Sequence, residues 1–364
     1  MKSHYRQFLI IVMVFTFSVI LAACGSKQNA NETESTTGSN DDKQYHLKVG
    51  YLKMNGAPLA DIAIHEGFFE EENLEVELVP FNASTDGINA LQTNKIDIGL
   101  TFGTTTPLAF IAKGADLNII GGHMEGGHPV YVPKEDADQY KTFADFKGKT
   151  IGTVRLSVPD IIFKNALLNA GLDIEKDVKF VEFKSNANLI EAAAARKVDA
   201  AFSLSGFLTQ ATEAGLVPFA WSNDVQPGHV CCRVVTHGDY TEDQQIAFKK
   251  FLKGLIKAER VKLENPQIAV EASKERFNLP DEQVNEIVNE EHLINSADPH
   301  KHQVEELWKQ MKGLGYIEGE AQNIDLNKHF NLKFYEEALE ELIAENPDDE
   351  YYQQVLERYK QQNL

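Results

Sequence analysis

The chain has 364 residues, of which 43% are hydrophobic and 25% charged, and its formal net charge is −20 at pH 7. This length excludes a single small scaffold and suffices for two domains, each with a hydrophobic core of its own. The excess of acidic residues argues against nucleic-acid binding, because phosphate groups require a basic surface.

The first segment has the pattern of a secretory signal with a cysteine that can carry a lipid. Lys2 and Arg6 precede an apolar run that ends in Leu21-Ala22-Ala23-Cys24. Small residues before the cysteine let a peptidase reach the bond, so we expect residues 1–23 to be removed and Cys24 to carry a diacylglycerol. The alternative is an uncleaved helix, because the apolar run approaches the roughly 17-residue lower limit for a membrane span.

Residues 24–44 are rich in Ser, Thr, Asn, Gly and acidic side chains and contain almost no apolar residue. Such a composition cannot bury enough surface to fold, and it predicts a disordered, flexible tether. We therefore expect a protein held by lipid at the extracytoplasmic face of the cell membrane.

Strands and helices alternate along the next part of the chain. Strands are predicted over residues 46–52, 74–81, 96–100 and 117–121, with helical patterns between them. The pattern repeats with strands over residues 150–154, 178–183 and 198–202. This alternation predicts the α/β class, with two similar halves and largely parallel sheets.

After Val230 the pattern becomes helical, with helices predicted over residues 241–263, 266–277, 281–292 and 301–314. We expect a first lobe over 45–130, a second over 131–230, and a return crossover with a helical tail that packs on the first lobe over 231–364. The acidic helix 336–345 and the segment 348–364 are interpreted as a terminal cap.

Cys231 and Cys232 are neighbours whose direct pairing would need a strained eight-membered ring, so a disulfide framework is not expected. We interpret them as small buried residues on the crossover strand. Two alternatives are that one thiol faces the ligand and that the pair is sensitive to oxidation.

A series of short motifs behind the lipid-attachment site carries a family resemblance. They include Val49-Gly50-Tyr51, Glu66-Gly67-Phe68-Phe69, Lys95-Ile96-Asp97-Ile98-Gly99, Phe146-Lys147-Gly148-Lys149-Thr150-Ile151-Gly152, Ala170-Gly171-Leu172 and Val198-Asp199-Ala200-Ala201. In this order they resemble the nitrate, sulfonate and taurine type of periplasmic solute-binding protein, a group that includes THI5-like binders of thiamine precursors. The motifs span about residues 48–235 and do not specify the ligand.

The resemblance implies a type II periplasmic-binding-protein fold, in which two α/β lobes joined by a hinge close on one small molecule. It implies a receptor without catalytic activity that delivers an anionic or polar organic solute to the permease and ATPase of an ABC importer. We expect a monomer that holds neither a cofactor nor a metal.

Ligands of open α/β sheets bind beyond the carboxyl ends of the strands, and this rule selects the loops that follow the predicted strands. The candidate ligand contacts are Asn55, Ser84, Thr85, Phe102, Thr104, Thr105, Met124, Glu125, Arg155, Ser157, Ser203 and Ser205. Several stand at helix starts, where free N–H groups favour an anion or a carbonyl oxygen. The alternative is that each hydroxyl only caps its own helix.

Arg155 could make a charge-assisted contact to a sulfonate, carboxylate or phosphate group, and its alternative role is a surface salt bridge across the cleft. Arg233 is similarly placed, with a structural pair between the lobes as the alternative. Phe102 and Phe207 border the selected loops and are the better candidates for stacking on a ligand.

The segment from His123 to His128 invites a metal interpretation, but its spacing matches no metal-site rule, and its glycines favour a mobile loop. Met124 and Glu125 are therefore interpreted as walls of the binding cleft. The role of His229 is left open between these interpretations.

Two other functions compete with the receptor. The first is an enzyme resembling the thiamine-pyrimidine synthase, which uses a lysine-bound cofactor, a reacting histidine and cysteines close to iron. Export away from cytosolic cofactors disfavours it, and Cys231-Cys232 is only a fragment of such a cluster. The second is a solute sensor that signals to a membrane kinase.

Overall fold

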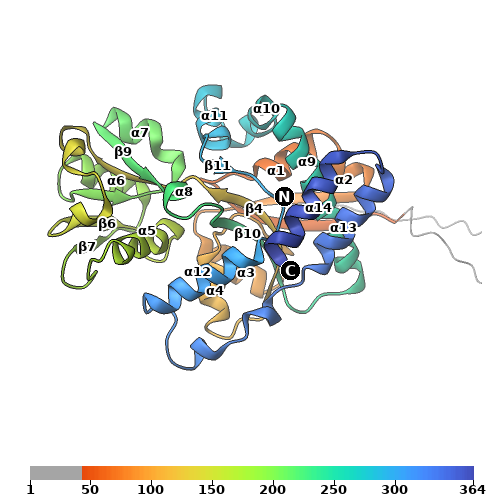
Figure 1. Ribbon diagram of the computed structural model, residues 1–364. Helices are drawn as coiled ribbons and strands as arrows, with labels where there is room; N and C mark the ends of the chain where they lie inside the picture. The colour runs from red at the N-terminus through yellow and green to blue at the C-terminus, as the bar shows by residue number, and fades with distance from the viewer. Residues whose placement is uncertain (1–42) are drawn as a thin grey trace, which may run out of the picture. The chain divides into compact units, whose positions relative to one another are not determined.

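A computed structural model describes residues 43–364 of the chain (Figure 1). The predicted signal sequence, Cys24 and nearly all of the predicted tether lie outside the described residues. Across residues 43–364, every helix is too short or too polar to cross a bilayer. The strands of this region belong to two separate sheets, each surrounded by helices.

The first sheet has six strands in the order β11-β4-β10-β3-β1-β2. Their bounds are β1 (Tyr45–Leu52), β2 (Leu74–Phe81), β3 (Ile98–Gly99), β4 (Leu117–Gly126), β10 (Val230–His237) and β11 (Leu293–Ile294). Strand β1 is parallel to β2 and β3, whereas β10 is antiparallel to β3 and β4.

The second sheet has five strands in the order β7-β6-β8-β5-β9. Their bounds are β5 (Pro129–Pro133), β6 (Thr150–Thr153), β7 (Lys179–Glu182), β8 (Ala200–Phe202) and β9 (Leu216–Trp221). Strand β6 is parallel to β7 and β8, and β5 is antiparallel to β8 and β9. The largely parallel sheets that the sequence predicts are therefore interrupted by β10 and β5, the strands by which the chain enters each sheet from the other.

Fourteen α-helices surround the two sheets in the described region. They are α1 (Pro58–His65), α2 (Phe68–Glu71), α3 (Ser84–Gln92), α4 (Thr105–Ile111), α5 (Val158–Asn169), α6 (Asn186–Ala194), α7 (Leu208–Glu213), α8 (Ser222–Val225), α9 (Glu242–Glu264), α10 (Gln267–Phe277), α11 (Asp281–Asn289), α12 (Lys301–Gly313), α13 (Lys333–Glu345) and α14 (Glu350–Asn363). Short 3-10 helices cover Lys134–Gln139, Phe143–Phe146, Ser205–Phe207, Gly319–Asn323 and Leu326–His329.

Local sequence signals account for the start of the longest helix, α9. The Thr241 hydroxyl accepts a hydrogen bond from the Gln244 backbone N–H at 3.2 Å, and the Gln244 side chain accepts one from the Thr241 N–H at 3.0 Å. This reciprocal capping box satisfies two backbone donors that the first turn of a helix leaves free.

The first sheet is covered on both faces. Strand β4 contributes to two cores, since Ile120 packs in the core that contains α1, α9 and α13, and Ile119 packs in the core that contains α4 and α12. The last helix joins the first core, where Tyr359 is buried and Arg358 pairs with Glu259 of α9 at 2.7 Å. The C-terminal helices α13 and α14 thus pack beside the first sheet (Figure 1).

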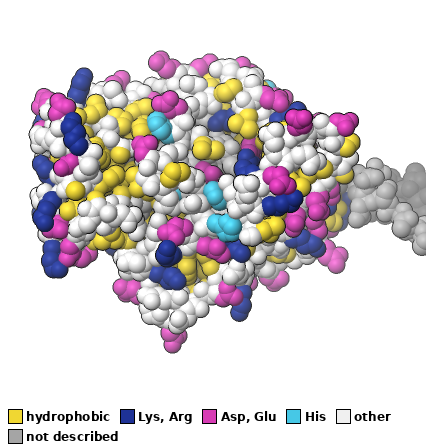
Figure 2. Space-filling view, viewed as in Figure 1, with side chains coloured by type: hydrophobic (Ala, Val, Ile, Leu, Met, Phe, Trp, Pro, Cys, Tyr) yellow, Lys and Arg dark blue, Asp and Glu magenta, His cyan; other side chains and the backbone are white. Residues whose placement is uncertain are grey.

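Helix α12 and the segment after it also contact the second sheet's helices. The hydroxyl of Tyr316 donates to Asp160 of α5 at 2.6 Å and accepts from Lys164 of α5 at 2.7 Å. The predicted tail therefore contacts both parts of the molecule. Helix α12 packs against α5 beside the second sheet, while α13 and α14 pack with the first sheet. On the face in Figure 2, acidic and basic side chains are interspersed and the basic ones form no continuous patch.

Candidate functional site

A cavity of about 560 Å³ lies at the carboxyl ends of strands from both sheets. Its wall comes from the loops after β1, β2 and β3 of the first sheet, the loops after β6, β7 and β8 of the second, and the start of β10. This is the place where ligands of open α/β sheets bind. Its described lining includes no carboxylate.

Seven of the twelve predicted ligand contacts line this cavity. They are Asn55, Ser84, Thr85, Phe102, Thr105, Arg155 and Ser157. Met124 and Ser205 line a second cavity of about 30 Å³, whose wall shares Met54, Asn55, Leu204, Phe207 and Cys231 with the larger one.

The other three predicted contacts, Thr104, Glu125 and Ser203, line neither cavity. Their side chains form hydrogen bonds with other residues of the protein. The Thr104 hydroxyl donates to the Cys231 carbonyl at 3.0 Å, and the Ser203 hydroxyl donates to Asn186 at 3.2 Å. The Glu125 carboxylate lies on β4, 3.1 Å from the His300 ring and 3.4 Å from the Arg233 guanidinium. Each residue stands near a strand end, but its side chain is turned into the interior.

Arg233 also has a structural role. Its side chain is fully buried, and its guanidinium donates to the carbonyls of Met124 at 2.7 Å, Asp298 at 2.8 Å and Cys232 at 2.9 Å. Burial raises the pKa of Glu125, but the His300 hydrogen bond and the Arg233 charge outweigh burial, so this pKa lies below its usual value. Arg233 thus forms a structural ion pair, but the pair joins β10 and β4 of the first sheet and not the two lobes.

Arg155 is an exposed cation at the wall of the larger cavity. Its guanidinium lies 3.3 Å from the Glu182 carboxylate and stacks over the Tyr316 ring at 4.6 Å from the centroid. A surface salt bridge is thus present, but it joins the neighbouring strands β6 and β7 and does not cross the cleft. An anionic ligand would compete with Glu182 for Arg155. Lys184 also lines the cavity.

The hydroxyl groups among the predicted contacts are of two kinds. Some cap the start of a helix, and others lie in the first turn of a helix without capping it. Ser157 caps α5, since its hydroxyl accepts from the Asp160 N–H at 3.4 Å. The N-cap of α3 is Ala83, which has no side chain that can cap, so Ser84 and Thr85 stand in the first turn of α3 at the cavity wall.

Sequence reasoning missed the loop after β7, which brings Lys184, Ser185 and Asn186 to the larger cavity. The Asn186 side-chain oxygen accepts hydrogen bonds from the Ser203 hydroxyl and, at 3.3 Å, from the Leu204 N–H. The strand-end rule that selected the other loops would have selected this one, because Lys184 follows a predicted strand directly.

The cysteine pair borders both cavities. The two Sγ atoms are 3.5 Å apart, Cys231 lines both cavities, and Cys232 lines the larger one. The hydrogen bond between the thiols raises the pKa of Cys231 well above its usual value and lowers that of Cys232. The predicted burial of the pair is confirmed, and one predicted alternative, a thiol at the ligand cavity, is compatible with this placement.

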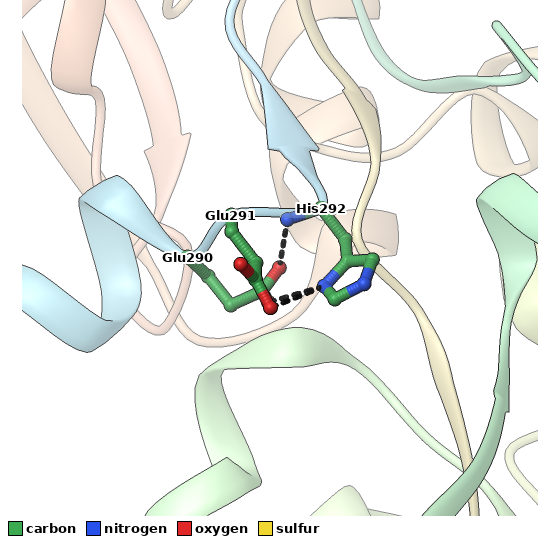
Figure 3. A group of neighbouring side chains, drawn as sticks. All are labelled: Glu290, Glu291 and His292. Atoms are coloured by element: carbon green, nitrogen blue, oxygen red, sulfur yellow. Dashed lines mark hydrogen bonds and ion pairs between the residues drawn. The ribbon is translucent and has the colours of Figure 1, made fainter.

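Residues 290–292 form a turn between α11 and β11 (Figure 3). The Glu290 carboxylate accepts from the His292 N–H at 2.9 Å and lies 2.7 Å from its ring nitrogen. The His292 ring stacks on Trp221 of β9 at 3.9 Å, so this turn joins the two sheets. Glu290, Glu291 and His292 are the one group of three neighbouring possible metal ligands found among the described residues. The contact between His292 and Glu290 accounts for their proximity.

Residues 60–269 match the model of the family described as NMT1/THI5 like. The chain belongs to this family. The NMT1/THI5-like chain is 23% identical over 231 residues to a protein of Brucella abortus described as a binding protein, covering 62% of this chain and 69% of the relative. It is 27% identical over 138 residues to a formylaminopyrimidine-binding protein of Halalkalibacterium halodurans, covering 36% of this chain and 40% of that protein.

The NMT1/THI5-like chain also shares its fold with a binding protein of solved structure. The periplasmic aliphatic sulphonate-binding protein SsuA of Escherichia coli aligns with a TM-score of 0.66 at 18% identity, covering 79% of this chain and 92% of that one. The predicted family and the predicted α/β periplasmic-binding fold are confirmed.

Three histidines of this NMT1/THI5-like protein, His123, His128 and His229, are buried. His123 lies within β4, so the predicted mobile loop at this place is wrong. His229 contacts the Ser222 hydroxyl at 2.7 Å, and the ring of His128 lies 5.4 Å from that of His229. Neither ring nitrogen of His123 or His128 has a hydrogen-bond partner.

Acidification from pH 6.5 to pH 4 should therefore destabilise the protein. Burial lowers the pKa of His123 to about 3 and that of His229 to about 4, and it lowers that of His128 well below its usual value. Below pH 6.5 the unfolded histidines bind protons that the folded ones reject, so their stabilisation is complete above pH 6.5 and is lost as the pH falls. Each histidine can contribute about 1.4 kcal/mol per pH unit.

Asp61 acts in the opposite direction over part of this range. Burial raises its pKa to about 6, so the folded state binds its proton first and Asp61 adds stability as the pH falls from 6 towards 4. Urea denaturation between pH 7 and pH 4 measures the sum of these effects. His123→Phe should flatten the slope, whereas His65→Phe, at an exposed position, should leave it unchanged. A stability independent of pH between 6.5 and 4 would contradict this assignment.

Proposed function

We propose that this NMT1/THI5-like protein is a non-enzymatic extracytoplasmic receptor that binds one small organic solute in the 560 Å³ cavity and delivers it to an ABC importer. The observation that carries the proposal is the cavity itself, which takes its wall from strand ends of both sheets. In this proposal, a first lobe over 45–130 and a second over 131–230 close on the solute, and residues 231–364 form the tail. Lipid attachment at Cys24 would hold the receptor near its permease.

The lining of the cavity supports an organic solute larger than nitrate. A volume of about 560 Å³ is in the range of sites for drug-sized molecules. Phe102 and Phe207 offer aromatic surface, and Asn55 and Asn186 offer amide groups. A planar polar molecule, such as a pyrimidine related to thiamine precursors, suits this lining, and the likeness to a formylaminopyrimidine-binding protein supports the same class.

The arrangement of basic groups favours a receptor over the synthase-like enzyme. That enzyme would need a lysine beside a histidine, whereas Lys184 lines the larger cavity and His128 lines the smaller one. The two groups therefore face different spaces, which supports a site that binds a solute without transforming it.

The protein starting at Lys43 should melt at a higher temperature with one member of a panel of pyrimidines, sulfonates, carboxylates and nitrate. A ligand that binds only the folded state stabilises it by about 2.7 kcal/mol at 100 times its dissociation constant. Turnover of the solute, or an unchanged melting temperature with the whole panel, would count against the receptor.

The charge of the solute is tested by removing the two cations of the cavity. Arg155→Ala with Lys184→Ala should weaken the binding of an anionic solute at least about tenfold, because charge-assisted contacts are the strong ones. It should leave a neutral pyrimidine bound. Lys179→Ala, an exposed cation on β7 outside the lining, is the matched control. An anionic solute that binds the double variant normally would place its contact elsewhere.

A further inference from the structure

Two free thiols, those of Cys231 and Cys232, lie side by side in the wall of the larger cavity. Both residues line this cavity of about 560 Å³, and their Sγ atoms are 3.5 Å apart. The two side chains are otherwise buried. A cavity of this size has room for many molecules of the size of water, so a reagent as small as hydrogen peroxide can enter it and meet the thiols.

A bulge in β10 brings the two thiols together. Val230 pairs with Glu125 of β4, and the next paired residue of β10, Cys232, pairs with Met124. Two steps along β10 therefore correspond to one step along β4. Successive side chains of a regular strand point to opposite faces, whereas the extra residue of a bulge changes the direction of a side chain. The bulge thus accounts for two consecutive cysteines with adjacent sulfur atoms.

The two thiols have unequal surroundings. The Asn55 amide donates to the Cys232 sulfur at 4.0 Å, and the Gly103 N–H donates to the same atom. The hydrogen bond from the Cys231 thiol lowers the pKa of Cys232, whereas the pKa of Cys231 lies well above its usual value. The thiolate is the nucleophilic form of cysteine, so Cys232 is the attacking sulfur and Cys231 is the resolving one.

We propose that Cys231 and Cys232 are a modification site, a dithiol in the cavity wall that hydrogen peroxide oxidises to a disulfide between the two neighbours. The Cys232 thiolate attacks one peroxide oxygen, the O–O bond breaks, and a sulfenic acid and a hydroxide ion form. The Cys231 thiol then attacks the sulfenic sulfur, the S–S bond forms, and water leaves. In the overall reaction, two thiols and one hydrogen peroxide give one disulfide and two water molecules.

A disulfide between neighbours is easily reduced, so this modification is reversible. The Cα atoms of disulfide-bonded residues are usually about 4.4–6.8 Å apart, whereas adjacent Cα atoms lie only about 3.8 Å apart across a trans peptide bond. The ring that two neighbours close is therefore strained, and strained disulfides are the labile ones. This agrees with the expectation from the sequence that the pair does not belong to a disulfide framework.

The test treats the full-length chain, as cells produce it, with hydrogen peroxide and then alkylates the remaining thiols with iodoacetamide in denaturant. Trypsin cleavage after Lys197 and Arg233 releases residues 198–233, a peptide with Cys231 and Cys232 but without methionine or a third cysteine. Its mass should be that of the reduced peptide less two hydrogen atoms, with no alkyl group attached. Dithiothreitol added before iodoacetamide should restore two alkylated cysteines.

Two matched variants test the roles of the sulfur atoms. Cys231→Ser keeps a hydroxyl donor beside Cys232, so its remaining thiol should form a sulfenic acid that dimedone captures. The remaining thiol of Cys232→Ser should react with peroxide at least about tenfold more slowly, because a rise of one pKa unit lowers the thiolate fraction about tenfold. Equal rates would overturn the assignment of Cys232 as the attacking sulfur.

Two alkylated cysteines in the unmodified chain after peroxide treatment would overturn the site, because the thiols would then be inert buried side chains. Oxygen retained on a single cysteine, without a disulfide, would overturn the pairing. Both outcomes are read on the unmodified chain, so they do not depend on whether a serine variant folds. The dithiol does not rest on the proposed transport function, because the reaction contains no organic solute.

Discussion

Replacing Arg233 by methionine should lower the free energy of unfolding by about 3–5 kcal/mol. The guanidinium is fully buried and donates to three carbonyl groups within 3 Å. Methionine would fill much of the space but would remove the donor to those carbonyls and leave the buried Glu125 carboxylate with His300 as its remaining side-chain partner. The loss of the cation beside the buried Glu125 carboxylate is the largest part of the cost, because the surrounding low polarity cannot replace water.

Urea denaturation at pH 7 measures this loss, with Arg155→Met as the control. Arg155 is exposed, so its replacement should change the free energy of unfolding by no more than about 0.5 kcal/mol. Equal effects of the two substitutions would show that the Arg233 network contributes little. Adding Glu125→Gln to Arg233→Met should restore part of the stability, because the unpaired charge is then removed.

Replacing Phe102 by alanine should cost about 3–5 kcal/mol and also weaken solute binding. The ring is 1% exposed, packs edge-on against Phe81 at 5.4 Å and forms part of the larger cavity. The ring occupies space that Gly87 and Gly99 leave free. A Cβ atom added to Gly87 would lie 2.1 Å from the Phe102 ring, and one added to Gly99 would lie 2.8 Å from it. Truncation therefore opens a hole that the neighbouring backbone cannot close.

Phe207→Ala is the matched control for Phe102→Ala. Phe207 lines the same cavity but is only partly buried, so its removal should weaken solute binding with a smaller loss of stability. Urea denaturation and a melting-temperature shift with the bound solute separate the two effects. A loss of stability for Phe102→Ala no greater than that for Phe207→Ala would contradict the packing role of Phe102.

Local periodicity was sufficient for most elements of the fold. The strand predicted over residues 74–81 agrees with β2 at both ends, because its alternation is bounded by clear turn signals. Strand β9 was missed, since Pro218 within it speaks against a strand. The predicted end of the strand at residue 121 was too early, because the segment from His123 to His128 was interpreted as a loop on account of its glycines, although β4 continues to Gly126.

The strand-end rule found the right loops but could not determine the directions of their side chains. Ser157 and Ser203 both follow a strand, yet Ser157 lines the cavity and Ser203 is bonded inside to Asn186. Arg155 and Arg233 are alike in sequence context, yet one is exposed and the other fully buried. Such differences arise from residues far away in the chain.

The sequence alone determined the class of the protein, the order of most strands and helices and the loops that bear the site, because periodicity and turn residues act locally. Tertiary structure decided which of those residues share a cavity. The carbonyls that bind Arg233 come from β4 and from the segment before α12, and the bulge beside Met124 brings together the thiols of Cys231 and Cys232. These arrangements depend on the pairing of distant segments, for which a single sequence carries no local signal.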